Sequence, residues 1–148
     1  MSEESVSQED KRNQTTEVIQ ELLEQRNKVW SLYCSVAGMA PFQPEKSIED
    51  LLEEFCEMLV DYISLGHFGV YQRIIDGKER RKRIVDVAEK LYPKIVLATE
   101  SVLKFNDRYE KVTPAMILNN LADDLSVVGE QLATRIELED ELIESMVA

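Results

Sequence analysis

The stretch LVDYISLGHFGVYQRI, residues 59–74, indicates how this chain folds. It continues an apolar pattern that begins at Leu51 and repeats every three or four residues, as one face of an α-helix does. At about 100° per residue, one broad arc carries Phe55, Leu59, Tyr62, Ile63, Val70 and Ile74. Ser47 followed by Asp50 resembles a capping box at the start of this helix. The pattern predicts a long amphipathic helix from Leu51 to about Ile75.

The opposite arc of the same helix changes character along its length. Acidic residues occupy its first half, at Asp50, Glu54, Glu57 and Asp61, and Ser64, Leu65, Phe68 and Gln72 follow. Two interpretations are open. Another helix of the domain covers Leu65 and Phe68, or a separate basic protein docks there and uses Phe68 as an apolar anchor. Gly66 and Gly69 each cost about 1 kcal/mol relative to alanine in a helix interior, which indicates that another backbone approaches closely.

Stop signals place a helix before this one. Apolar residues at helical spacing begin near Thr15 or Thr16 and end at Gly38, which suits a left-handed cap. Pro41 and Pro44 then mark a connecting loop, because each lacks an amide donor.

Further helices follow the central one. Asp76-Gly77 precedes KERRKRIVDVAEKLY, residues 78–92, which predicts a shorter helix, and Pro93 either kinks the chain or opens another helix through Phe105. Thr113-Pro114 marks the start of a last, long helix. The expected fold is therefore all-α, an antiparallel bundle of about five to six helices with a long C-terminal helix.

Composition bounds the organisation of the chain. Its 148 residues suffice for one domain with a sizeable core. Residues 1–14 are polar, lack the apolar segment of a signal peptide and are expected to form a flexible acidic tail before a single domain at 15–148. No apolar run approaches the roughly 18 residues of a membrane span, so we expect a cytoplasmic protein. Cys34 and Cys56 are interpreted as reduced thiols inside helices.

The net charge of −12 argues against direct binding of nucleic acid, which requires clustered Lys and Arg. It favours a basic partner, or it only keeps the protein in solution. The one basic run, KERRKR at residues 78–83, reads as the solvated opening of a helix or as a contact with an acidic second partner.

Two charged residues lie on stripes that should be buried, Arg26 on the first helix and Glu139 on the last. An unpaired buried charge is strongly destabilising, so each is expected to meet an opposite charge or a water-filled cavity, unless Arg26 reaches out to the surface. Helical rise places Arg26 and Asp61 at similar depth. We therefore predict a polar cluster of Arg26 with Asp61 or Glu139, extended by His67 or Tyr62. His67 is otherwise a structural hydrogen-bonded side chain, or a pH-sensitive or partner-contacting one.

The sequence contains no recognisable catalytic or metal-binding motif. It has no phosphate-binding glycine loop, no nucleophile elbow, no Cys/His pair and no metal-ligand spacing, and its single histidine excludes a di-iron bundle site. We expect no enzyme activity, no metal and no cofactor.

Several of these segments resemble the Rsd/AlgQ family of regulators of the primary, sigma-70-type, sigma factor. Residues 59–74 are similar to the family signature LVDY-[LVI]-S-A-G-H-F-x-[VI]-Y-E, and RIELEDELIE at 135–144 is similar to its R-F-x-L-E-D-x-L-I ending. RNKVWSLYCSVAGMAP at 26–41 supports the resemblance, and AEKLYPKIVLATESVLKFNDR at 88–108 looks closest to the AlgQ branch. The chain departs from the family where Glu21 and Leu22 replace an Arg-Trp pair and Leu65 replaces alanine.

The resemblance implies an anti-sigma factor. Such a helical bundle binds the C-terminal, DNA-reading domain of the primary sigma factor (region 4) and blocks its contacts with promoter DNA and core RNA polymerase. The basic sigma domain would then dock on Glu57, Asp61, Ser64, Leu65, Phe68 and Gln72. Phosphocarrier and stringent-response proteins are further partners implied by the family. The rival hypotheses are a bundle whose polar cavity, lined by Arg26, Tyr62, His67 and Glu139, binds a small anion or metabolite, and an adaptor for other regulatory proteins.

Overall fold

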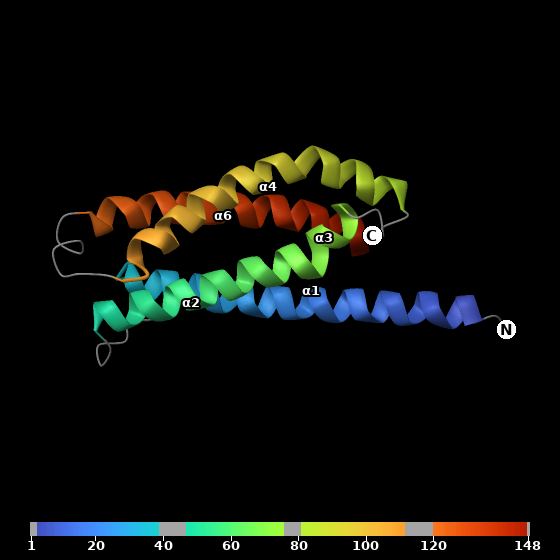
Figure 1. The fold of residues 1–148 in the computed structure, drawn as a ribbon, viewed down its shortest axis with the longest axis horizontal. Helices are drawn as coiled ribbons and strands as arrows, with labels where there is room; N and C mark the ends of the chain where they lie inside the picture. Colours follow the sequence, from blue (N-terminus) through green and yellow to red (C-terminus); the bar gives the residue numbers. More distant parts are fainter. Residues whose placement is uncertain (1–2, 39–46, 76–80, 112–119, 148) are drawn as a thin grey trace.

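The computed structural model describes residues 3–38, 47–75, 81–111 and 120–147, and every regular element among them is helical (Figure 1). The long helices are α1 (Glu3–Val36), α2 (Ile48–Gly66), α4 (Lys82–Tyr109) and α6 (Leu121–Val147). A π-helical turn, η1 (His67–Tyr71), and a single α-turn, α3 (Gln72–Ile75), continue α2. None of the described helices combines the length and apolar composition needed to cross a membrane.

The four long helices alternate in direction, as expected for an antiparallel bundle (Figure 1). α1 packs along α2, α4 packs along α6, and the two pairs face each other across a common core. All four helices contribute fully buried apolar side chains to this core, among them Leu22, Phe55, Leu59, Ile84, Leu91, Val102, Leu132 and Leu142. Burial of these stripes stabilises the bundle.

The all-helical class is confirmed, but the expected count of five to six helices is not, because the described residues form four long ones. Pro93 opens no new helix. It lies inside α4, and buried residues on both sides of it, Leu91 and Ile95, belong to one stripe. Packing of this stripe holds the helix together where proline removes a hydrogen bond.

The starts and ends of the helices agree with the sequence in part. The Ser47 hydroxyl accepts a hydrogen bond from the Asp50 amide (3.2 Å), so Ser47 caps α2 as predicted. Gly38, just after α1, has a positive φ of 77°, which suits the predicted cap. The predicted start of the first helix near Thr15 or Thr16 is wrong, since α1 begins at Glu3. The flexible tail at 1–14 remains a prediction.

Other predictions fall outside the described residues: the loop with Pro41 and Pro44, the turn at Asp76-Gly77 and the helix start at Thr113-Pro114. Of the basic run, the structure describes Arg81, Lys82 and Arg83. Cys34 and Cys56 are free thiols, half-buried and buried respectively.

Candidate partner-binding face and the buried polar network

The predicted partner face lies along the outer side of α2 and η1. Glu57 and Asp61 are exposed, whereas Ser64, Leu65 and Gln72 are half-buried. Phe68 is 71% exposed, more than any other large hydrophobic side chain that the structure describes. The interpretation in which another helix covers Phe68 therefore fails for the described residues.

Leu65 differs from Phe68, because it packs partly against the core and leaves only part of its side chain on the surface. The neighbouring His67 ring stands edge-on to Phe68, with 4.9 Å between the ring centroids. Edge-to-face contact of this kind is a favourable arrangement of two aromatic rings.

The acidic part of this face continues to the start of α2. A shallow hollow there is lined, among the described residues, by Asp50, Glu53, Glu54 and Glu57. From Glu57 to Phe68 the helix rises about 16 Å, which a single recognition element of a partner can span. The face thus offers a row of negative charges that ends at one aromatic anchor.

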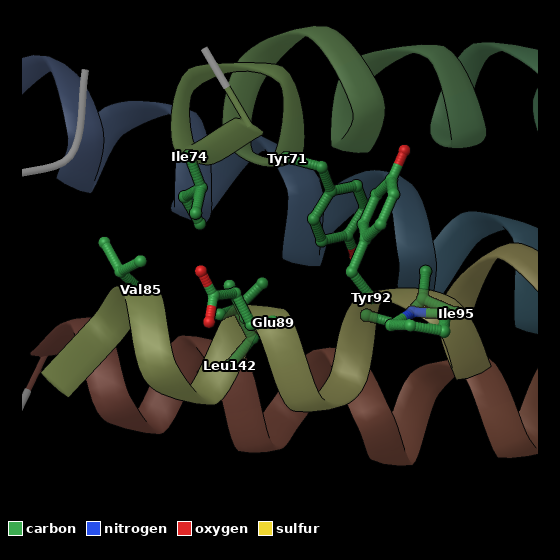
Figure 2. A pocket seen from close by; sticks show the side chains of 9 residues that line it. Tyr71, Ile74, Val85, Glu89, Tyr92, Ile95 and Leu142 are labelled. Carbon is green, nitrogen blue, oxygen red and sulfur yellow. The ribbon is translucent and has the colours of Figure 1, made fainter. Parts of the chain in front are cut away.

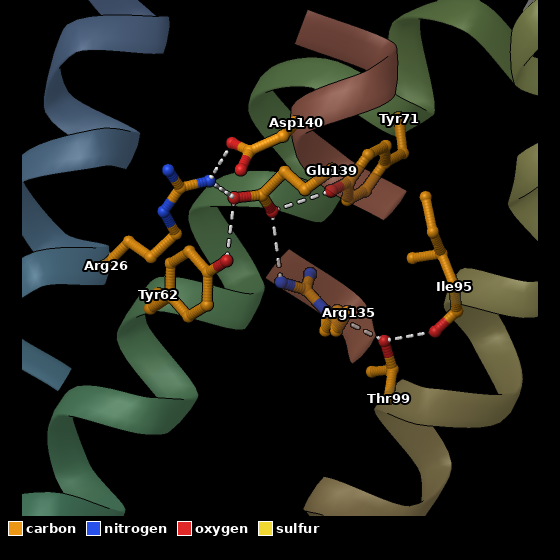
Figure 3. A network of polar contacts seen from close by, with 8 residues as sticks. All are labelled: Arg26, Tyr62, Tyr71, Ile95, Thr99, Arg135, Glu139 and Asp140. Carbon is orange, nitrogen blue, oxygen red and sulfur yellow. Dashed lines mark hydrogen bonds and ion pairs between the residues drawn. The ribbon is translucent and has the colours of Figure 1, made fainter. Parts of the chain in front are cut away.

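Beneath this face, Glu139 of α6 forms the centre of a buried network (Figure 3). Its side chain is completely buried, and its Oε1 accepts from Tyr62 Oη at 2.7 Å and from Arg26 Nη1 at 3.3 Å. Its Oε2 accepts from Tyr71 Oη at 2.7 Å and from Arg135 Nη1 at 3.1 Å. Four donors from four elements therefore converge on one carboxylate.

The two arginines are paired differently. Arg26, which is half-buried, also donates to Asp140 Oδ1 at 2.7 Å, so it reaches the edge of the bundle. Arg135 is 1% exposed, and its Nε donates to Thr99 Oγ1 at 2.9 Å. Thr99 in turn donates to the carbonyl of Ile95 at 2.6 Å, which ties the network to α4. The guanidinium carbon of Arg135 lies 4.9 Å from the centroid of the Tyr62 ring.

Burial and the Glu139 charge shape the titration of the network. Burial raises the pKa of Tyr62 above its ordinary value, and the charge of Glu139 raises it further. The pKa of Tyr71 is raised for the same two reasons. Burial opposes the charge of Arg135, but the surrounding Tyr71, Tyr62 and Glu139 leave its pKa raised. Both phenols therefore stay protonated donors and Arg135 stays a cation at neutral pH.

The structure brings Arg26, Tyr62 and Glu139 together, as the sequence suggested, and it leaves two proposed members out. Asp61 is exposed on the outer face, and His67 contacts Phe68 rather than Glu139. Arg26 meets Glu139 and Asp140 and does not extend into solvent alone.

Sequence reasoning missed Tyr71, Arg135 and Thr99. Tyr71 was missed because it lies in the π-helical turn. A π-helix turns by a smaller angle per residue than an α-helix, so the side of the helix on which Tyr71 lies differs from the one an α-helical count gives, and Tyr71 comes to the side of Tyr62. Arg135 is four residues before Glu139 on the same face, a spacing that signals an ion pair.

Gly66 and Gly69 make room for side chains, not for the backbone that the sequence predicted. A Cβ on Gly66 would lie 3.3 Å from Arg135 Nη2 and 3.3 Å from Tyr71 Cε2. A Cβ on Gly69 would lie 2.7 Å from Val18 Cγ1 of α1. The two glycines thus let the buried arginine and α1 pack against α2 and η1.

The basic run makes an internal contact. Arg81 Nη1 donates to the Met146 carbonyl at 3.1 Å, and Arg83 Nη2 donates to the Ser145 carbonyl at 2.9 Å. Cations near the C-terminal end of a helix are favourable, so these arginines join the start of α4 to the end of α6.

Comparison with known proteins gives one consistent result. Residues 1–147 match the family model described as "Regulator of RNA polymerase sigma(70) subunit, Rsd/AlgQ". The chain is 34% identical over 143 residues to the Regulator of sigma D of Yersinia enterocolitica, and the aligned region covers 88% of this chain and 80% of that protein. It is 35% identical over 144 residues to the protein of that name in Yersinia pseudotuberculosis, with coverage of 88% and 79%. The Shigella dysenteriae protein of that name is 29% identical over 134 residues, with coverage of 87% and 83%. No solved structure matches the chain significantly.

Proposed function

Since the chain belongs to the Rsd/AlgQ family of regulators of the RNA polymerase sigma-70 subunit, we propose that it binds the primary sigma factor through the outer face of α2 and η1. The part bound is the C-terminal, DNA-reading domain. A bundle seated on that domain blocks its contacts with promoter DNA and core RNA polymerase, and so acts as an anti-sigma factor in the cytoplasm.

The observation that carries this proposal is the exposure of Phe68 beside a row of acidic residues. A basic DNA-reading domain complements the charge of Glu57 and Asp61, and an apolar pocket on that domain would receive the phenyl ring. Opposite charges steer the two proteins together, while the buried ring supplies most of the affinity.

The rival hypothesis, a polar cavity for a small anion, is not favoured. The two arginines of the network face two carboxylates, Glu139 and Asp140, so the charges of the described cluster sum to zero. An anion would need a surplus of positive charge that is free to bind it. Phosphocarrier and stringent-response proteins remain predicted partners from the family resemblance.

Retrieval of the sigma factor from a lysate of the source bacterium tests the proposal. The test variant combines Asp61→Arg with Phe68→Ala. The control combines Asp86→Arg with Leu97→Ala on α4, where Asp86 is exposed and Leu97 is 67% exposed. Circular dichroism establishes that both variants stay folded.

The wild-type and control proteins should retrieve the sigma factor, and the test variant should not. Equal retrieval by test and control variants would reject the proposed face. Absence of the sigma factor from every sample would reject the function.

A further inference from the structure

A pocket of ≈ 330 Å³ opens between η1, α3, α4 and the end of α6, and none of the residues of the predicted partner face lines it (Figure 2). Ile74, Val85, Ile95 and Leu142 supply aliphatic walls, and the rings of Tyr71 and Tyr92 lie side by side with centroids 6.4 Å apart. Its volume is near the lower end of the roughly 300–1,000 Å³ of ligand pockets, so it suits a small molecule.

Glu89 of α4, which is exposed to solvent, is the one charged residue among the described residues that line this apolar pocket. Figure 2 shows its carboxylate pointing from α4 into the space below Ile74 and Tyr71. Among the described residues none forms an ion pair with Glu89, in contrast to the carboxylate of Glu139. The described lining of the pocket therefore presents a single negative charge beside aromatic rings.

Pro93, which also lines the pocket, adds a second acceptor. Proline has no amide hydrogen, so the Glu89 carbonyl, four residues earlier in α4, cannot receive the usual helical hydrogen bond from residue 93. A backbone carbonyl that lacks this bond is free to accept a hydrogen bond from another donor. The carboxylate and the carbonyl of Glu89 are thus both able to accept a further hydrogen bond, and Glu89 and Pro93 both line the pocket.

We propose that this pocket binds a small organic cation, a primary amine joined by a short chain to an aromatic or branched aliphatic group. The ammonium group donates to the Glu89 carboxylate and carbonyl, and the apolar group lies against Tyr71 and Tyr92. An apolar protein cavity of about 150 Å³ holds benzene, so a pocket of ≈ 330 Å³ has room for a phenyl ring with a short aminoalkyl chain. The proposal does not depend on sigma binding.

Charge sets the class of ligand. Among the residues that the structure describes around the pocket, an anion of the same shape would meet two acceptors and no cationic donor. A neutral analogue would keep only the contacts with the rings. Cation–π attraction to the tyrosine rings further favours the amine.

Nuclear magnetic resonance titration of the isotope-labelled full chain tests this proposal without a sigma factor. The probe is phenethylamine, and phenethyl alcohol and phenylacetate are its neutral and anionic counterparts. A ligand of this size with these contacts is expected to bind with a Kd of about 1 mM. The affected amides should lie in η1, α3 and residues 85–95 of α4.

Glu89→Gln preserves the size of the side chain. It should weaken the binding of phenethylamine at least tenfold and leave the affinity for phenethyl alcohol unchanged. Asp86→Asn removes the same charge from an exposed site on α4 outside the pocket and should leave both affinities unchanged. Pro93→Ala restores the backbone amide that donates to the Glu89 carbonyl. Because the carbonyl is then already hydrogen-bonded, the variant should weaken the binding of phenethylamine severalfold.

Several results would overturn the proposal. One is the absence of saturable phenethylamine binding up to roughly 20 mM, well above the expected Kd. Another is binding of phenylacetate at least as tight as that of phenethylamine. A third is an equal loss of affinity in Glu89→Gln and Asp86→Asn, which would show a long-range effect of net charge instead of a site.

Discussion

Replacing Glu139 by glutamine perturbs the buried network without changing its shape. The amide of glutamine keeps one acceptor oxygen and replaces the other by an NH2 group, which donates. If the amide nitrogen takes the place of Oε2, the donors Tyr71 Oη and Arg135 Nη1 lose their acceptor. If it takes the place of Oε1, Tyr62 Oη and Arg26 Nη1 lose theirs. Either orientation removes the acceptor of one phenol and of one arginine.

The larger effect is the loss of the charge that compensates Arg135. Arg26 keeps Asp140 at 2.7 Å, but Arg135, 1% exposed, is left with neutral partners such as the hydroxyl of Thr99. Removing one partner of a buried ion pair costs about 3–5 kcal/mol, against roughly 5–15 kcal/mol for the stability of a whole domain. We expect Glu139→Gln to lower the free energy of unfolding by about 4 kcal/mol.

Urea unfolding followed by circular dichroism measures this change. Asp140→Asn is the matched control, because Asp140 contacts the same Arg26 but its side chain is 47% exposed, so the loss should be about 0–1 kcal/mol. Adding Arg135→Met to Glu139→Gln removes the orphaned cation and should restore much of the stability. A loss below about 1 kcal/mol in Glu139→Gln, equal to that of Asp140→Asn, would refute the idea that Glu139 holds the network together.

Three further predictions concern other contacts. Burial opposes ionisation of Asp124, but hydrogen bonds from Tyr109 (2.5 Å) and Arg108 (2.9 Å) lower its pKa below the ordinary value of 3.8. The ionised Asp124 carboxylate therefore stabilises the fold fully above pH 3.8, and this contribution is lost as the pH falls through the lower pKa of the folded state. In acid unfolding experiments, the difference in stability between the wild type and Asp124→Asn should disappear below that folded-state pKa. Gly69→Ala should destabilise the bundle by about 1–3 kcal/mol in thermal or urea unfolding, because the new Cβ would meet Val18. Adding Val18→Ala should restore most of the lost stability. An unchanged stability of Gly69→Ala alone would contradict this packing. Stopped-flow association with the sigma domain should slow about tenfold or more between roughly 50 and 500 mM salt, and a salt-independent rate would argue against charge steering.

The helical class and the α2 stripe followed from the sequence because their spacing reports a local property. The Ser47 cap and the arc that is buried from Phe55 to Val70 could be predicted without knowledge of the rest of the chain. Pro93 misled the helix count, since its local preference opposes a helix while packing of Leu91 and Ile95 supports one. Tertiary packing outweighed a local signal there.

The network could be predicted only in part. Arg26 and Glu139 stood out because a charge on an apolar stripe needs a partner, and the structure pairs them. Tyr71 was not predictable by counting about 100° per residue, because the η1 turn breaks that count, and Thr99 carries no signal of its own in the sequence. The exposure of Phe68 could not be decided either, since either a helix or a partner would explain an apolar residue on that arc.

Mapping the contact surface of the labelled chain with the purified C-terminal domain of the primary sigma factor tests the central claim most directly. Amide hydrogen exchange or chemical-shift changes on addition of that domain should concentrate in residues 57–72 of α2, η1 and α3, with Phe68 at the centre. The exposed side of α4 around Leu97 should be unaffected. Changes confined to α4 and α6, with residues 57–72 unperturbed, would contradict the claim that this acidic, aromatic face captures the sigma factor.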